Sequence, residues 1–310
     1  MSSISVTHLE RRVLVAANDG VLLAVRVCGP RDARHTVVLL HGHCARGESW
    51  TDVRAALRHS GARIVSYDHR GHGGSGIAAR STYTLEQLAD DLRSVLDALA
   101  PTGSVVLVGH SMGGMAVLTY LARNPHEVGA RIAGVALIAT AAGGLAEAGF
   151  GRLLRNPLIS AFQTAVAFAP RLMQRAKLVA ATVFAPVIRT AEFGDRRVGP
   201  RVLALAAAMR NQTPIVTMAA FLSAFAAFDR TDALRLLGRI PTLVLCGGAD
   251  LMTPQAHSVA MAAAVDYCDL VLLEGAGHSV IMERPVEVAD AIGRLLSRAA
   301  HPAPVTAVAA

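Results

Sequence analysis

Six short runs of valine, leucine and isoleucine recur along the chain, and helix-like segments lie between them. The runs cover residues 36–42, 63–71, 104–111, 134–140, 241–250 and 269–278. They show no alternation of apolar and polar residues, which is typical of strands buried on both faces. One intervening segment, 84–100, carries leucines along one helical stripe, and Thr84 with Gln87 forms an N-cap box at its start. This order predicts an α/β fold with a doubly wound, mostly parallel sheet.

Two further strands and one helical segment complete the predicted organisation. The stretches 11–19 and 21–29 flank Gly20 and indicate an antiparallel hairpin, which brings the predicted sheet to eight strands. Residues 141–238 show helical periodicity and no convincing strand, and prolines punctuate them. The predicted units are a core of residues 10–140 and 239–298, a helical cap inserted between strands six and seven at 141–238, and a disordered tail at 299–310.

The longest uncharged run, residues 98–122, exceeds the roughly 20 residues that suffice to span a membrane. However, Pro101, Gly103 and a glycine-rich turn divide it into a helix end, a strand and a second helix. The second-longest uncharged run, 211–228, contains Asn, Gln and Pro and is better explained as a buried or lid helix. We recognise neither a transmembrane helix nor a secretory signal, and we expect a cytoplasmic protein.

The composition favours a large buried core and reduced thiols. Apolar residues make up 53% of the chain and charged residues 17%, which disfavours disorder. The cysteines are scattered without a C-x-x-C pair or a histidine at ligand spacing, at Cys28, Cys44, Cys246 and Cys268. This spacing argues against a disulfide framework and against a zinc site. We expect no metal and no cofactor, and the sequence does not set the oligomeric state.

The basic excess belongs to one part of the chain. The formal net charge is +7, and residues 141–238 contain 12 basic and 5 acidic side chains. These arginines are dispersed among alanines and leucines rather than clustered with aromatic residues, so we expect no nucleic-acid binding. We interpret them as polar helix faces. The alternatives are an anionic substrate and transient contact of the basic cap with a membrane surface.

The motif G-H-S-M-G follows a predicted strand and opens a predicted helix. This is the context that a nucleophile elbow requires, with Ser111 as the nucleophile. The turn is so tight that a side chain at Gly109 or Gly113 would collide with the backbone that crosses it. The following helix would direct its free N–H groups at the same place.

A serine nucleophile needs a base, and the base needs a carboxylate that orients it. His278 ends one predicted strand and Asp250 ends the preceding one, so both fall at the same end of the sheet as Ser111. The order Ser, Asp, His is the order of the hydrolases. Asp266 and Asp269 precede a strand and therefore lie at the wrong end. His110 and His257 are interpreted as packing or surface histidines.

A tetrahedral oxyanion also needs hydrogen-bond donors. One predicted donor is the backbone N–H of Met112, the residue after the nucleophile. The second is the backbone N–H of His43, which follows Gly42 in the loop after the strand 36–42. The His43 side chain is expected to line the pocket.

Five motifs in this order resemble the α/β-hydrolase superfamily: HGHCARGESW, YDHRGHGGSG, VGHSMGG, GGADLMTP and GAGHSVIMERP. The likeness is strongest to the branch of serine esterases, monoacylglycerol-lipase-like enzymes and cofactor-free haloperoxidases, in which a helical cap occupies the position of 141–238. The resemblance implies Ser111, Asp250 and His278 as a catalytic triad. It also implies that Asp68, Arg70 and His72 support a loop rather than take part in catalysis.

The expected activity is cleavage of a carboxylic ester or thioester with a hydrophobic acyl group, through an acyl-Ser111 intermediate. A lipophilic small molecule is the expected partner. All eight phenylalanines lie within 141–238; we expect most to form the core of the cap and some to line an acyl pocket. The alternatives are a haloperoxidase or perhydrolase activity, an acyltransferase on the same triad, and a non-catalytic ligand receptor.

Overall fold

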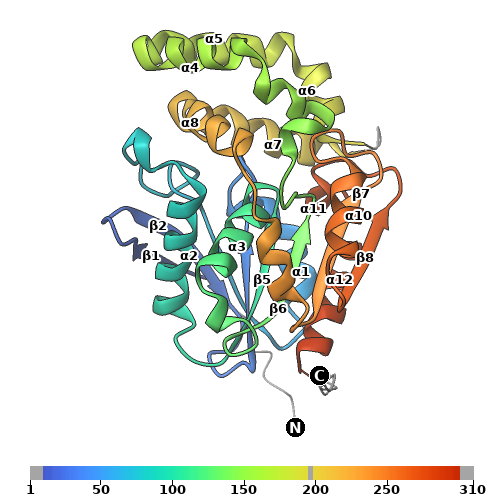
Figure 1. Cartoon of the computed structure of the whole chain (residues 1–310). Helices are drawn as coiled ribbons and strands as arrows, with labels where there is room; N and C mark the ends of the chain where they lie inside the picture. Colours follow the sequence, from blue (N-terminus) through green and yellow to red (C-terminus); the bar gives the residue numbers. More distant parts are fainter. Residues whose placement is uncertain (1–9, 195–197, 301–310) are drawn as a thin grey trace.

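The computed structural model describes residues 10–194 and 198–300, and it contains one eight-stranded sheet with helices on both faces (Figure 1). The strands are β1 (Arg11–Ala16), β2 (Leu22–Cys28), β3 (His35–Leu40), β4 (Arg63–Tyr67), β5 (Ser104–His110), β6 (Ile132–Ile138), β7 (Thr242–Gly247) and β8 (Cys268–Leu273). Their spatial order is β1-β2-β4-β3-β5-β6-β7-β8. β2 runs antiparallel to β1 and β4, and all the other pairs are parallel. The predicted sheet is confirmed.

The central strands are uncharged because both of their faces are covered. In β5, Val105 and Leu107 pack into one hydrophobic cluster, whereas Val106 and Val108 pack into a second cluster on the opposite face. All four side chains have no exposed surface. Successive residues of a strand point to opposite faces, so an unbroken apolar run supplies both clusters at once.

The helices of the core are α1 (Thr51–Leu57), α2 (Leu85–Leu99), α3 (Met112–Arg123), α9 (Leu234–Leu237), α10 (Gln255–Ala263), α11 (Val280–Glu283) and α12 (Pro285–Ala300). α2 and α3 pack together on one face of the sheet, and α1 and α12 pack together on the other. The predicted N-cap of α2 is confirmed, since the Thr84 hydroxyl accepts a hydrogen bond from the backbone N–H of Gln87. α12 runs to Ala300, two residues beyond the predicted end of the core. Residues 301–310 of the predicted tail lie outside the described part of the chain.

Between β6 and β7 the chain forms a helical cap above the carboxyl ends of the strands (Figure 1). Its helices are α4 (Pro157–Phe168), α5 (Pro170–Val183), α6 (Ala185–Glu192), α7 (Pro200–Gln212) and α8 (Ile215–Ala226). No helix in the described residues is both long enough and apolar enough to cross a membrane. The uncharged run 211–228 contains α8, which packs against the core rather than standing alone.

The prediction that most phenylalanines form the core of the cap is wrong. Phe221, Phe225 and Phe228 are buried in the main cluster on the α2–α3 face of the sheet, and Phe193 is buried in the cluster on the other face. The small cluster that belongs to the cap itself is built around Val166, Ile215 and Ala219, with Phe162 packed on it. The physical reason is that α8 lies on the core domain and directs its aromatic side chains into it. The remaining phenylalanines are Phe150, Phe168 and Phe184, and all three are exposed.

Candidate active site

The turn predicted to be a nucleophile elbow joins β5 to α3 through one strained residue. Ser111 has φ 54° and ψ −121°, a conformation that non-glycine residues rarely adopt. A Cβ atom at Gly109 would lie 2.5 Å from the carbonyl oxygen of Gly113, and one at Gly113 would lie 2.4 Å from that of Leu40. Both glycines are therefore required by the close approach of backbone, as predicted. Thr140 steadies the turn, because its hydroxyl donates to the Ser111 carbonyl at 2.8 Å.

Ser111, His278 and Asp250 are brought together from three separate loops. The Oγ of Ser111 lies 2.9 Å from Nε2 of His278, and Nδ1 of His278 lies 2.9 Å from Oδ2 of Asp250. Asp250 follows β7 and His278 follows β8, so the parallel strands deliver both side chains to the end of the sheet where β5 delivers Ser111. This arrangement can transfer the hydroxyl proton to the imidazole while the carboxylate orients the ring.

Asp250 is held by its own loop as well as by His278. Its Oδ1 accepts hydrogen bonds from the backbone N–H groups of Met252 and Thr253, at 2.8 and 2.9 Å. The Thr253 hydroxyl donates to Oδ2 at 2.8 Å. Sequence reasoning did not single out Thr253, although its position three residues after an aspartate is a signal for this local hydrogen bonding.

The two titratable partners shift one another. Burial alone would raise the pKa of Asp250, but His278 and the hydrogen bonds from Thr253 outweigh burial and lower it. Burial alone would lower the pKa of His278, but the carboxylates of Asp250, Glu192 and Glu283 outweigh burial and raise it above 6.5. A carboxylate that stays ionised beside an imidazole of raised pKa is suited to stabilising the imidazolium formed during catalysis.

The positions of Met112 and His43 suit them to form an oxyanion hole. Met112 is the first residue of α3, so its N–H has no acceptor within that helix. A Cβ atom at Gly42 would lie 3.1 Å from the Cβ of Ser111, which places the loop after β3 directly against Ser111. His43 follows Gly42, and its backbone N–H has no acceptor within the described residues. Its ring packs edge-on against Phe225 with centroids 5.1 Å apart, and burial lowers its pKa to about 3.

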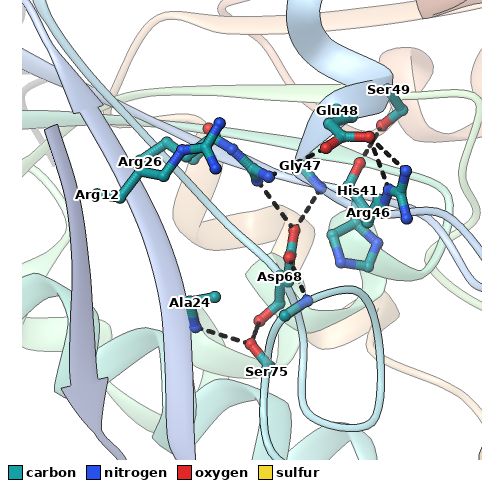
Figure 2. Close-up of polar contacts among 12 residues, drawn as sticks. Arg12, Ala24, Arg26, His41, Arg46, Gly47, Glu48, Ser49, Asp68 and Ser75 are labelled. Carbon is teal, nitrogen blue, oxygen red and sulfur yellow. Dashed lines mark hydrogen bonds and ion pairs between the residues drawn. The ribbon is translucent and has the colours of Figure 1, made fainter. Parts of the chain in front are cut away.

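Asp68 anchors the loop after β3 through its carboxylate (Figure 2). Its Oδ1 accepts hydrogen bonds from the backbone N–H of Gly47 at 2.7 Å and from Arg26 at 3.5 Å. Its Oδ2 accepts one from the backbone N–H of Gly74 at 2.8 Å. Ser75 extends the network, because its hydroxyl donates to the Asp68 carbonyl and accepts from the N–H of Ala24. The carboxylate thus connects the loops after β3 and β4 with strand β2.

The neighbouring residues Arg70 and His72 also hold loops in place. The Arg70 guanidinium is fully buried and binds both Asp91 and Asp19. Nε2 of His72 accepts a hydrogen bond from the backbone N–H of Cys44 at 3.2 Å, and burial lowers its pKa to about 4. The contact from His72 stabilises the loop that carries His43, whereas the ion pairs of Arg70 hold the loop after β4.

The two histidines interpreted as packing or surface residues differ in their surroundings. His110 is buried, and its Nε2 donates to the backbone carbonyl of His278 at 2.9 Å. Burial and the nearby His278 lower its pKa to about 3, which keeps the ring neutral. His257 is partly exposed on α10, and the charge of the nearby Asp250 opposes the lowering of its pKa by burial.

The triad opens into a cavity with two lobes that share His43, Ser111, Leu222, Met252 and His278. The smaller lobe has a volume of about 150 Å³ and is lined almost wholly by apolar groups from the elbow helix and the cap: Met112, Met115, Leu145, Phe150, Gly151, Leu154 and Phe225. The larger lobe has a volume of about 380 Å³, within the usual range of ligand pockets.

One wall of the larger lobe is charged, which the sequence did not reveal. Arg210 of α7 and Glu192 of α6 form an ion pair with an N–O distance of 2.7 Å. The Nε of Arg210 is buried without a hydrogen-bond partner. Burial raises the pKa of Glu192, and Arg210 opposes that shift. No local pattern marks these residues, because only the folding of the cap brings them to the triad.

Comparison with known proteins agrees with the fold. A family model described as the alpha/beta hydrolase fold matches residues 35–285. A monoacylglycerol lipase from Mycolicibacterium smegmatis is 34% identical over 121 residues, which is 38% of this chain and 43% of that protein. A bifunctional esterase/perhydrolase from Acinetobacter calcoaceticus is 34% identical over 113 residues, 36% of this chain and 40% of that protein. The chain thus matches only about two fifths of the length of each.

A solved structure extends the likeness to the whole fold. A thermophilic esterase from Thermogutta terrifontis is 27% identical and superimposes with a TM-score of 0.74, over 93% of this chain and 99% of that one. The chain belongs to the α/β-hydrolase family, as its motifs predicted. Within residues 10–194 and 198–300, no group of three or more His, Cys, Asp or Glu side chains is arranged to hold a metal ion.

Proposed function

We propose that the protein is a serine hydrolase that cleaves a carboxylic ester or thioester of a hydrophobic acyl group. The observation that carries the proposal is the continuous contact from Ser111 Oγ through His278 to Asp250, with two distances of 2.9 Å. Relatives that bear the names esterase and lipase support the same reaction class.

Acylation of Ser111 is the first half of the proposed reaction. Ser111 Oγ attacks the carbonyl carbon of the substrate while Nε2 of His278 takes the hydroxyl proton. The carbonyl oxygen becomes an oxyanion, which accepts hydrogen bonds from the backbone N–H groups of Met112 and His43. His278 then gives its proton to the departing alcohol or thiol, and the acyl group remains on Ser111.

Deacylation repeats the same steps with water. Nε2 of His278 takes a proton from water, and the water oxygen attacks the acyl carbon. The second oxyanion accepts hydrogen bonds from the same two backbone N–H groups. The proton returns to Ser111 Oγ, and the carboxylic acid leaves. Asp250 stays ionised throughout, since its lowered pKa favours the carboxylate.

The cavity suggests how the substrate is placed. The small apolar lobe suits the acyl chain, because no Asp, Glu, Lys or Arg side chain lines it. The larger lobe suits a polar or anionic part on the other side of the scissile bond, because Arg210 keeps an unused donor there. Both lobes draw side chains from the cap, so we assign substrate selection to residues 141–238.

Active-site labelling tests the reaction class. A fluorophosphonate should add one adduct to the intact mass of the wild-type protein and none to Ser111→Ala. An unlabelled wild-type protein would overturn the assignment. Assays with p-nitrophenyl esters in the presence of peroxide or an acceptor alcohol then separate hydrolysis from perhydrolysis and acyl transfer.

Chain-length profiling tests the acyl lobe. Wild type should prefer octanoate to acetate, and Leu154→Trp should lower kcat/KM for octanoate about tenfold more than for acetate, because the indole fills the lobe. Leu153→Trp is the matched control, since Leu153 is exposed and does not line the cavity. A preference for acetate in the wild type would contradict the acyl-lobe assignment while leaving the reaction class intact.

A further inference from the structure

The outer surface of the cap exposes an unusual number of large apolar side chains. They lie along α4, α5 and α6 at Leu158, Phe168, Leu172, Leu178, Val179, Val183, Phe184 and Val187. Phe168 is 86% exposed and Leu172 is 66% exposed, so these residues do not contribute to the core. α4 and α5 are the outermost layer of the molecule on this side, beyond α7 and α8 (Figure 1). Large apolar side chains that are exposed together on one surface mark an interaction site.

One helix shows the arrangement most clearly. α5 turns Met173, Gln174 and Lys177 inward, and Lys177 Nζ binds backbone carbonyls at the end of α7. Its opposite side presents Leu172, Val179 and Val183, which recur at helical spacing on one stripe. α5 is therefore inverted relative to an ordinary surface helix: the polar Lys177 faces the cap, and an apolar stripe faces solvent.

The charge around this stripe has one sign. No Asp or Glu occurs between Glu147 and Glu192, and Glu192 is paired with Arg210. Arg171 and Arg175 lie exposed beside the stripe and make no hydrogen bond or ion pair within the described part of the chain. Exposed apolar side chains rimmed by unpaired arginines match the headgroup region of an anionic bilayer.

We propose that the outer face of α4, α5 and α6 docks on an anionic lipid membrane. A second copy of the chain fits this face less well, because a two-fold contact places the same patch on both partners and would oppose arginine to arginine. The cavity opens to solvent beneath the cap, since Phe150 and Met252 both line it and are about 40% exposed.

Vesicle flotation tests the proposal without depending on catalysis. The wild-type protein should float with phosphatidylcholine vesicles that contain phosphatidylglycerol, should not float with phosphatidylcholine alone, and should be released by salt. Leu172→Ser with Val183→Ser should weaken binding at least about tenfold, and Arg171→Gln with Arg175→Gln should do the same.

Matched variants control for surface polarity and net charge. Leu14→Ser with Ile77→Ser changes equally exposed apolar residues elsewhere, and Arg239→Gln with Arg294→Gln removes the same charge; both should bind as wild type does. Equal wild-type binding to both vesicle types, or cap variants that bind normally, would overturn the proposal. Light scattering that shows a dimer, converted to monomer by Leu172→Ser with Val183→Ser, would assign the face to a second copy.

Discussion

The backbone carbonyl of Glu192, the last residue of α6, accepts a 2.8 Å hydrogen bond from the backbone N–H of Ser279, the residue after His278. Glu283 reinforces this connection, because its carboxylate accepts from the N–H of Gly194 at 3.2 Å and from that of Gly277 at 2.8 Å. The cap is therefore fastened to the loop that carries His278, the proposed catalytic base. A change in the cap can alter both the shape of the cavity and the titration of His278.

The first prediction concerns pH. His278 acts as a base only when neutral, so kcat/KM should rise with pH through its raised pKa. Glu192→Gln removes one of the negative charges that favour the imidazolium. The pKa of His278 should fall, and the acid limb of the kcat/KM profile should move to lower pH. Glu147→Gln, at an exposed position in the cap, should leave the limb in place. An unmoved limb in Glu192→Gln would refute the coupling.

The second prediction concerns the orientation of Asp250. Asp250→Asn should lower kcat/KM about ten-thousand-fold, because an amide no longer fixes the reactive tautomer of His278. Thr253→Val should lower it about tenfold, through loss of one hydrogen bond to the ionised carboxylate. Thr231→Val removes the similar contact to Asp229, where neither residue lines the cavity, and it should leave kcat/KM unchanged. A Thr253→Val variant as active as Thr231→Val would contradict this role.

The third prediction concerns the elbow. Gly113→Ala should reduce the free energy of unfolding by at least about 2 kcal/mol, because its methyl group would overlap the carbonyl of Leu40. It should also abolish activity by displacing Ser111. Gly293→Ala, within α12 with open space around its Cβ, should instead stabilise the protein by about 0.5–1 kcal/mol. Urea denaturation measures both, and similar values for the two variants would contradict the packing argument.

The fourth prediction concerns the buried ion pair beneath the site. Arg70→Met leaves Asp91 buried without its partner, and it should cost about 3–5 kcal/mol in urea denaturation. The control is Arg155→Met, whose partner Glu147 is exposed, and it should cost less than about 1 kcal/mol. A cost for Arg70→Met no larger than that of the control would show that the loop after β4 is held by other contacts.

Most of the fold could be predicted from local patterns. Unbroken apolar runs such as Val105–Val108 indicate strands buried on both faces, and Thr84 with Gln87 indicates the start of α2, because these signals depend only on neighbouring residues. The strand ends also predicted which loops would meet. In parallel strands, Ser111, Asp250 and His278 all fall at carboxyl ends, so topology alone brings them to one edge of the sheet.

The cap was the part that local patterns did not decide. Its phenylalanines looked like a core of their own, yet Phe221 and Phe225 pack into the main domain, whereas Phe168 faces solvent. The pairing of Arg210 with Glu192 had no sequence signal, since helices of a cap can pack in many arrangements with the same periodicity. The sequence by itself determined the sheet, the elbow and the residues of the proposed triad. Only the tertiary structure decided which cap side chains reach the triad and which remain outside, because helix packing depends on contacts between distant residues.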